Sequence, residues 1–138
     1  MYKFIKENKM VDKNVVETAI NQIEKKYKIT FPKLFKDYAL SFDGAKIALS
    51  SFVVHGYACE VAKIIPICGA GLTFEKIVDN DRSDGFISDS LYPLASTRGG
   101  DLYYWNDING AVYLLLADDI ENPFRICDSI EQFFALIG

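Results

Sequence analysis

The sequence predicts an α+β fold in which a central, mostly antiparallel twisted sheet is packed by N-terminal helices and a C-terminal helix. Two observations in the second half of the chain predict the sheet. Asn109-Gly110 separates two β-prone runs, and Gly99-Gly100 separates the first of these from a third. The helices are predicted by apolar residues that recur every three or four positions near both ends of the chain.

The predicted sheet consists of three runs with short connections, Leu91–Ala95, Leu102–Trp105 and Ala111–Ala117. The Asn-Gly pair between the last two favours a type I′ hairpin turn, because both residues tolerate a positive φ. Aromatic and β-branched side chains in these runs suit a half-buried pleated surface. The sequence therefore predicts an antiparallel meander.

Three helices are expected at the two ends of the chain. Asp12 is a good N-cap for a helix over residues 13–27, whose apolar positions are spaced four, three and four apart. A second helix is expected over residues 32–42, with a proline in its first turn and a wide aromatic face. The last helix begins after Asp128, which with Glu131 resembles a capping box.

The segments between these elements are less regular. Ile47–Val54 and Tyr57–Ile65 are β-prone runs, and His55-Gly56 between them predicts a hairpin. Thr73 is expected to cap a short helix that ends near Val78. Asp79–Asp89 is dense in Asp, Asn, Ser and Gly and is expected to be an exposed polar loop.

Two further segments follow the predicted meander and precede the last helix. Asp118–Asn122 is expected to form an acidic turn, and Phe124–Cys127 a short edge strand that begins after Pro123. The first eleven residues are a lysine-rich lead-in, either a short strand or a frayed end.

Length and charge narrow the class of protein. A chain of 138 residues is expected to form one domain, residues 1–138. The net charge is −4, but residues 1–37 carry +4 and residues 78–138 carry −8. The acidic second half argues against nucleic-acid binding and favours cationic partners. No apolar run approaches the ~20 residues of a membrane helix, so no membrane partner is expected.

The sequence offers no recognisable catalytic, cofactor or metal site. Three widely spaced cysteines without a C-x-x-C pair indicate reduced thiols in a cytosolic protein rather than a disulfide scaffold or a zinc site. The acidic stretch after Val78 faintly resembles a calcium loop, but Ser90 stands where the bidentate glutamate is required. The single histidine, His55, lies in a predicted turn. We therefore expect a binding protein without a cofactor, rather than an enzyme.

The order and punctuation of the elements resemble the SUKH superfamily, the group around the fungal Smi/Knr cell-wall synthesis regulators and many bacterial toxin-immunity proteins. The resemblance is carried by four stretches in the family's order: Ile23–Tyr27 with Ile29–Pro32; Phe35–Gly44; Leu91–Ala95 with Arg98–Asp101; and Gly110–Tyr113 with Asp128–Phe134. Asp43 stands where asparagine is common in the family. Ile47–Ser90 matches poorly.

The resemblance implies a cytoplasmic immunity protein that binds and neutralises a cognate polymorphic or contact-dependent bacterial toxin through surface complementarity. The acidic second half suggests a cationic toxin, nucleases being one such class. Alternatively, it implies a non-enzymatic regulatory or scaffold module of the Smi/Knr type. A third reading, a small enzyme or ligand-binding domain using Cys59, Cys68 or His55, would require a deep pocket that holds two of them.

The residues expected to contact a partner are carboxylates of the acidic segments and two aromatic residues of the meander, whose side chains alternation places on one face. They are Asp79, Asp81, Asp84, Asp89, Tyr103, Trp105, Asp107, Asp118, Asp119 and Glu121.

Overall fold

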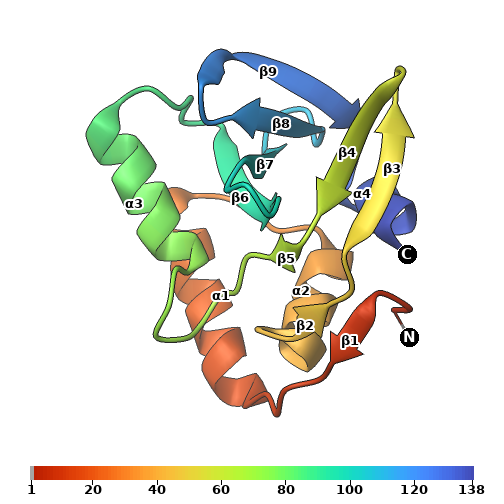
Figure 1. Cartoon of the computed structure of the whole chain (residues 1–138). Helices are drawn as coiled ribbons and strands as arrows, with labels where there is room; N and C mark the ends of the chain where they lie inside the picture. The colour runs from red at the N-terminus through yellow and green to blue at the C-terminus, as the bar shows by residue number, and fades with distance from the viewer. Residues whose placement is uncertain (1) are drawn as a thin grey trace.

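The computed structural model describes residues 2–138 and shows the predicted α+β architecture, with helices packed around antiparallel sheets (Figure 1). The helices are α1 (Lys13–Tyr27), α2 (Lys33–Phe42), α3 (Phe74–Asp84) and α4 (Ile130–Ile137). The strands are β1 (Ile5–Glu7), β2 (Lys46–Ile47), β3 (Ser50–Val54), β4 (Tyr57–Val61), β5 (Lys63–Ile64), β6 (Leu91–Ser96), β7 (Leu102–Asn106), β8 (Val112–Leu116) and β9 (Asp119–Cys127).

The largest sheet has five strands in the order β5-β6-β7-β8-β9, and every neighbouring pair is antiparallel. The predicted meander is its centre, and β5 and β9 are its edges. The two predicted runs before Pro66 are each split: β3 pairs with β4 as a separate hairpin, while β2 pairs with β1 and β5 pairs with β6.

The type I′ turn predicted at Asn109-Gly110 is wrong. The turn spans residues 107–110, because the backbone N–H of Asn106 donates to the carbonyl of Ala111, and only Gly110 has a positive φ, of 79°. The Asn106 side chain accepts from two N–H groups inside this turn and so favours the longer form. A two-residue turn with both φ values positive occurs instead at His55-Gly56, at 51° and 77°.

The polar loop predicted over Asp79–Asp89 is also wrong in its first half, because α3 continues to Asp84. Phe74, Ile77 and Val78 anchor its first turns in the core. The helix ends where Gly85 adopts a φ of 78°, with its N–H donating to the carbonyl of Asp81. Tertiary packing of this apolar face outweighs the weak helix propensity of the Asp- and Asn-rich turns.

The caps predicted from sequence are present in α1 and α3, and that of α4 differs in detail. Asp12 accepts from two N–H groups of α1, and Thr73 accepts from the third residue of α3. In α4 the cap is Ser129, and Gln132 rather than Glu131 reaches back, accepting from the N–H of Asp128.

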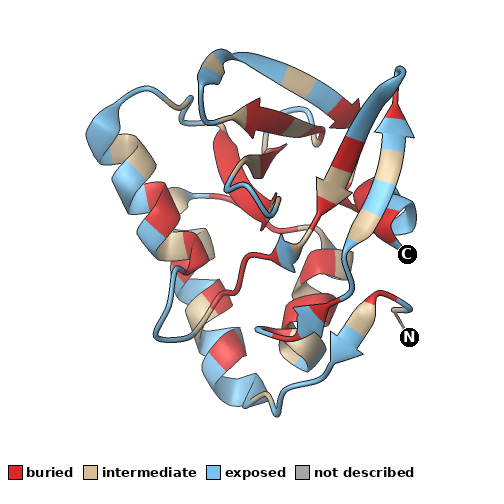
Figure 2. Ribbon diagram, viewed as in Figure 1, coloured by how far each residue is buried: buried red, intermediate tan, exposed pale blue. Residues whose placement is uncertain are grey.

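The main core lies between one face of the large sheet and helices α1, α2 and α4, together with the first turns of α3 (Figure 2). Alternation along β7 works as predicted: Tyr103 and Trp105 face this core, and Tyr104 faces a smaller cluster with Leu91 and Leu115 on the opposite side. Both faces of the central strand are therefore buried, and its aromatic side chains are packed inside the protein.

Candidate protein-binding surface

The predicted contact residues do not lie together, because strand register separates them. Leu91 pairs with Asn106 at one end of the sheet, so the loop before β6 and the turn after β7 share that end. Leu116 pairs with Asp119 at the other end. The carboxylates of Asp118, Asp119 and Glu121 therefore lie at the opposite end of the sheet from those of Asp89 and Asp107.

The two predicted aromatic contacts, Tyr103 and Trp105, are core residues, which corrects that prediction. Tyr103 is fully buried, and its hydroxyl donates to the carbonyl of Glu60 at 2.7 Å. Trp105 is 6% exposed, with its ring 5.8 Å from that of Phe31. Neither is exposed for a partner to contact.

Asp79 and Asp81 already accept hydrogen bonds from other side chains of this protein. Asp79 accepts from the hydroxyl of Tyr27 at 2.7 Å and from the ammonium of Lys26 at 3.3 Å, and these donors hold the pKa of its carboxyl below its ordinary value. Asp81 accepts from the hydroxyl of Tyr104 at 2.9 Å, although burial raises the pKa of this carboxyl. Both carboxylates fix α3 against its neighbours.

The remaining acidic residues at this end are accompanied by two apolar side chains that sequence reasoning missed. Phe86 is 77% exposed in the loop after α3, and Ile108 is 82% exposed at the tip of the β7–β8 turn. Their neighbours in sequence include Asp84, Asp89 and Asp107. We refer to these five residues as the acidic end surface. Its sequence signal is the presence of large apolar residues, Phe86 with Ile87 and Ile108, within otherwise polar loops.

Hydrogen bonds hold the two loops of the acidic end surface together. The N–H of Asp107 donates to the carbonyl of Ser90 at 3.0 Å, which joins the β7–β8 turn to the loop before β6. Arg82 donates to the carbonyls of Ser88, Asp89 and Leu91, and its guanidinium lies 5.0 Å from the centre of the Tyr92 ring. These contacts fix the loop that carries Phe86 and Asp89 to the end of the sheet.

Asp89 also forms an ion pair with Arg82, at 3.6 Å, although its side chain is 95% exposed. Asp84 and Asp107 make no salt bridge among residues 2–138. A cavity of about 420 Å³ lies beside Ile108, with Tyr92, Arg82 and Asp107 in its wall. An apolar side chain next to exposed carboxylates is complementary to a partner protein whose surface carries cationic and apolar groups.

At the opposite end of the sheet, the β8–β9 turn presents Asp118, Asp119 and Glu121, all exposed. The predicted acidic turn is shorter than expected, because Asp119 already begins the nine-residue strand β9. Asp119 accepts from the side-chain amide of Asn122 at 2.8 Å. No large apolar side chain of this turn is among the strongly exposed ones, so it is an acidic patch without an apolar anchor.

Two observations bear on whether side chains of residues 2–138 could carry chemistry: metal-ligand clustering and the activation of the cysteine thiols. Within residues 2–138, no three His, Cys, Asp or Glu side chains are placed to hold a metal ion. Burial raises the pKa of all three cysteine thiols, to about 11 for Cys127, so the thiolate form is disfavoured. His55 is exposed at the tip of the β3–β4 hairpin. None of the helices in this part of the chain has the length and apolar character to cross a membrane.

Comparison with known proteins assigns the family. The family model described as SMI1 / KNR4 family (SUKH-1) matches residues 14–136. The chain belongs to the SMI1/KNR4 family. The match runs from the start of α1 to the end of α4, and so includes the middle segment that resembles the superfamily least in sequence. A search of curated proteins found no match.

Proposed function

We propose that this SMI1/KNR4-family protein is a cytoplasmic immunity protein that neutralises a cognate toxin by direct contact and performs no catalysis of its own. The acidic end surface is the site of contact, and the toxin presents a cationic surface, as a nuclease does. Family membership supports a protein-interaction role. The acidic end surface supports the choice of partner.

The observation that carries the proposal is the exposure of Phe86 and Ile108 on two loops that hydrogen bonds join. Large apolar side chains exposed on loops that lie against each other, with polar groups around them, suit a protein-interaction site. Aromatic and large apolar anchors contribute most of the binding energy in such sites, and bordering charges select the partner and speed association. Asp84 and Asp107, which make no salt bridge with any residue from 2 to 138, supply those charges.

The test is a comparison of two charge-reversal variants of equal net charge. The first carries Asp84→Lys, Asp89→Lys and Asp107→Lys at the acidic end surface. The matched control carries Asp118→Lys, Asp119→Lys and Glu121→Lys at the other end of the sheet. Each variant is expressed with the toxin encoded by the neighbouring gene, and bacterial growth and co-purification of the two proteins are measured.

We expect the first variant to lose protection and co-purification, while the control keeps both. Because the two variants have the same total charge, a difference between them reports the place of contact rather than the overall field of the protein. Equal loss in both variants would reduce the role of charge to non-specific attraction. Full protection by the first variant would exclude the acidic end surface as the contact site.

A further inference from the structure

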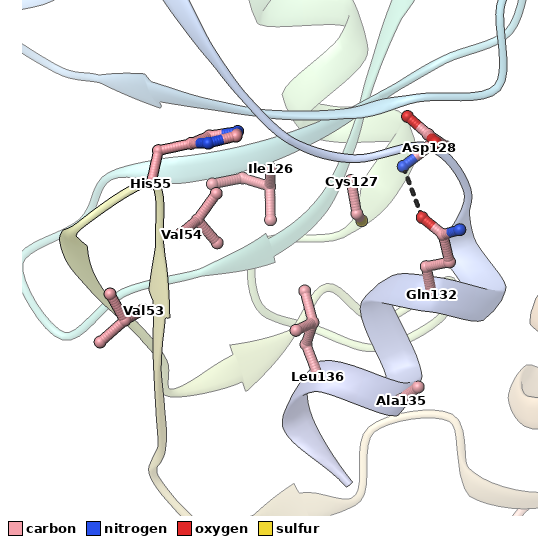
Figure 3. A pocket seen from close by; sticks show the side chains of 9 residues that line it. All are labelled: Val53, Val54, His55, Ile126, Cys127, Asp128, Gln132, Ala135 and Leu136. Atoms are coloured by element: carbon pink, nitrogen blue, oxygen red, sulfur yellow. Dashed lines mark hydrogen bonds between the residues drawn. The ribbon is translucent and has the colours of Figure 1, made fainter.

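An apolar groove lies on a different part of the surface, between strand β3, the C-terminal end of β9 and helix α4 (Figure 3). Its volume is about 540 Å³. Val53 on the strand side and Leu136 on the helix side are 67% and 38% exposed, and Ile126 lies between them. Two apolar walls are therefore open to solvent beside the C-terminal end of β3.

The strand that borders this groove has an unused hydrogen-bonding edge. Among the strands of residues 2–138, β3 pairs only with β4, and the two-residue turn His55-Gly56 closes on the pair Val54 and Tyr57. Since alternate residues of an antiparallel pair turn their backbone groups outward, the N–H and C=O groups of Ser51 and Val53 point away from β4. No other backbone hydrogen bond within residues 2–138 reaches them.

The register of the hairpin independently supports the outward orientation of the Ser51 and Val53 backbone groups. Ser51 pairs with Glu60 on β4. The carbonyl of Glu60 accepts from the Tyr103 hydroxyl, so this carbonyl points away from β3, as it must at an outward-facing pair. The sequence of β3, SSFVV, contains no charge and no proline, the features that usually protect an edge strand from pairing.

Charge decides between possible occupants of the groove. The only acidic or basic side chain in its wall besides His55 is Asp128, whose side chain is 71% exposed. Its Oδ1 accepts from Arg125 at 2.7 Å, which leaves Oδ2 able to accept from another cation. A second copy of this chain would bring another uncharged β3 strand, which supplies no cation for Asp128.

We propose that the groove binds an extended segment of another protein, which adds as a strand to the edge of β3. Its apolar side chains lie at alternate positions between Val53 and Leu136, and a basic residue lies at the Asp128 end. An extended segment fits because a strand can use the outward backbone groups of β3, whereas a helix has its backbone groups already paired. The proposal concerns residues outside the acidic end surface and stands independently of the toxin-neutralising role.

The probe is a set of three fluorescent peptides of about six residues, a length matched to β3. The first alternates valine and threonine and has a lysine at one end, the second has glutamate in place of lysine, and the third carries N-methyl groups on alternate amides. Binding to the full chain is measured by fluorescence anisotropy, and amide hydrogen exchange is followed at Ser51 and Val53.

We expect the lysine peptide to bind about fivefold more tightly than the glutamate peptide, as an exposed ion pair and its reversal would give. Its binding should slow exchange at Ser51 and Val53, and N-methylation should abolish it. Equal binding of the N-methylated peptide, or unchanged exchange at the two amides, would overturn strand addition. Equal affinity for lysine and glutamate peptides would overturn the assignment of a basic residue.

Variants of the chain supply the complementary test. Val53→Pro removes an outward N–H together with the valine side chain that lines the groove, and should abolish binding. Leu136→Ser should weaken binding severalfold. Leu72→Ser, at an exposed leucine outside the groove, is the matched control and should bind as the parent does. If Val53→Pro unfolds the hairpin, the N-methylated peptide decides, because it uses the unaltered protein. A dimer of the parent that protects Ser51 and Val53 without peptide would make a second copy the occupant and overturn the proposal.

Discussion

The hydrogen bond from Tyr104 to Asp81 gives the clearest test of how α3 is held. Tyr104 is 3% exposed in the small cluster behind the sheet, and its hydroxyl lies 2.9 Å from an Asp81 carboxylate oxygen. Tyr104→Phe removes only the hydroxyl and keeps the ring in place. The perturbation therefore isolates one donor to one partly buried carboxylate.

The expected loss follows from the charge on the acceptor. A hydrogen bond to a charged group contributes about 1.5–3 kcal/mol, and one between neutral groups about 1 kcal/mol. Tyr104→Phe should therefore lower the free energy of unfolding by about 2 kcal/mol in the parent but by about 1 kcal/mol in an Asp81→Asn background. The double-mutant cycle should give a coupling energy of about 1 kcal/mol at neutral pH.

The same pair predicts a pH dependence. Burial raises the pKa of folded Asp81 above its ordinary value of 3.8, so the folded state holds a proton that the unfolded state has released, and stability falls as pH rises through that window. Loss of the Tyr104 donor raises the folded pKa further. The difference between parent and Tyr104→Phe should therefore be smallest below the ordinary pKa and grow as pH rises.

Urea denaturation followed by far-UV circular dichroism and by Trp105 fluorescence measures these free energies. Agreement between the two probes tests whether unfolding is two-state. A coupling energy near zero at neutral pH, or a difference that shrinks as pH rises, would refute the assignment of a charged acceptor to Tyr104.

Three further predictions follow. The double variant Phe86→Ser, Ile108→Ser should leave the free energy of unfolding within about 0.5 kcal/mol of the parent, as substitutions at exposed positions do. It should weaken toxin binding, measured by calorimetry, at least 30-fold, because each apolar side chain loses about 1–2 kcal/mol of burial in the complex. Unchanged affinity would contradict the proposed role of the two side chains. Gly56→Ala should destabilise the β3–β4 hairpin by about 1 kcal/mol, since alanine disfavours a φ of 77°; thermal melting should show a lower Tm, and a melt equal to the parent's would argue against the turn type. Asp43→Ala should lower the free energy of unfolding by about 2 kcal/mol, because the backbone N–H groups of Ile67 and Cys68 lose the carboxylate to which they donate at 2.7 and 3.0 Å. A urea midpoint within error of the parent's would show that water replaces the carboxylate.

Local patterns predicted the elements that depend on local physics. Helical periodicity identified α1, α2 and α4, and the β-prone runs identified the meander. The turn prediction failed at residues 107–110, where the Asn106 side chain caps a longer turn, and succeeded at His55-Gly56. Single-residue turn preferences do not include such a side-chain partner, so sequence could not rank the two forms.

The contact residues were harder to predict because burial is a property of the assembled sheet. Tyr103 and Trp105 have the composition of an interface, but helices on one face and the α3 loop on the other leave β7 no exposed face. Asp79 and Asp81 read as solvated charges until α3 places them against Tyr27 and Tyr104. Charge counts predict the sign of a surface, and tertiary contacts decide which carboxylates are free.

The bonds made by Arg82 have a consequence for the rate and strength of association. One guanidinium donates to the carbonyls of Ser88, Asp89 and Leu91, so the C-terminal part of the loop that carries Phe86 loses conformational freedom when the chain folds. Ordering a free backbone at the moment of contact would cost about 1–2 kcal/mol per residue. When a partner binds, this part of the loop is therefore already ordered. Little of the binding free energy is then offset by the entropy cost of ordering it.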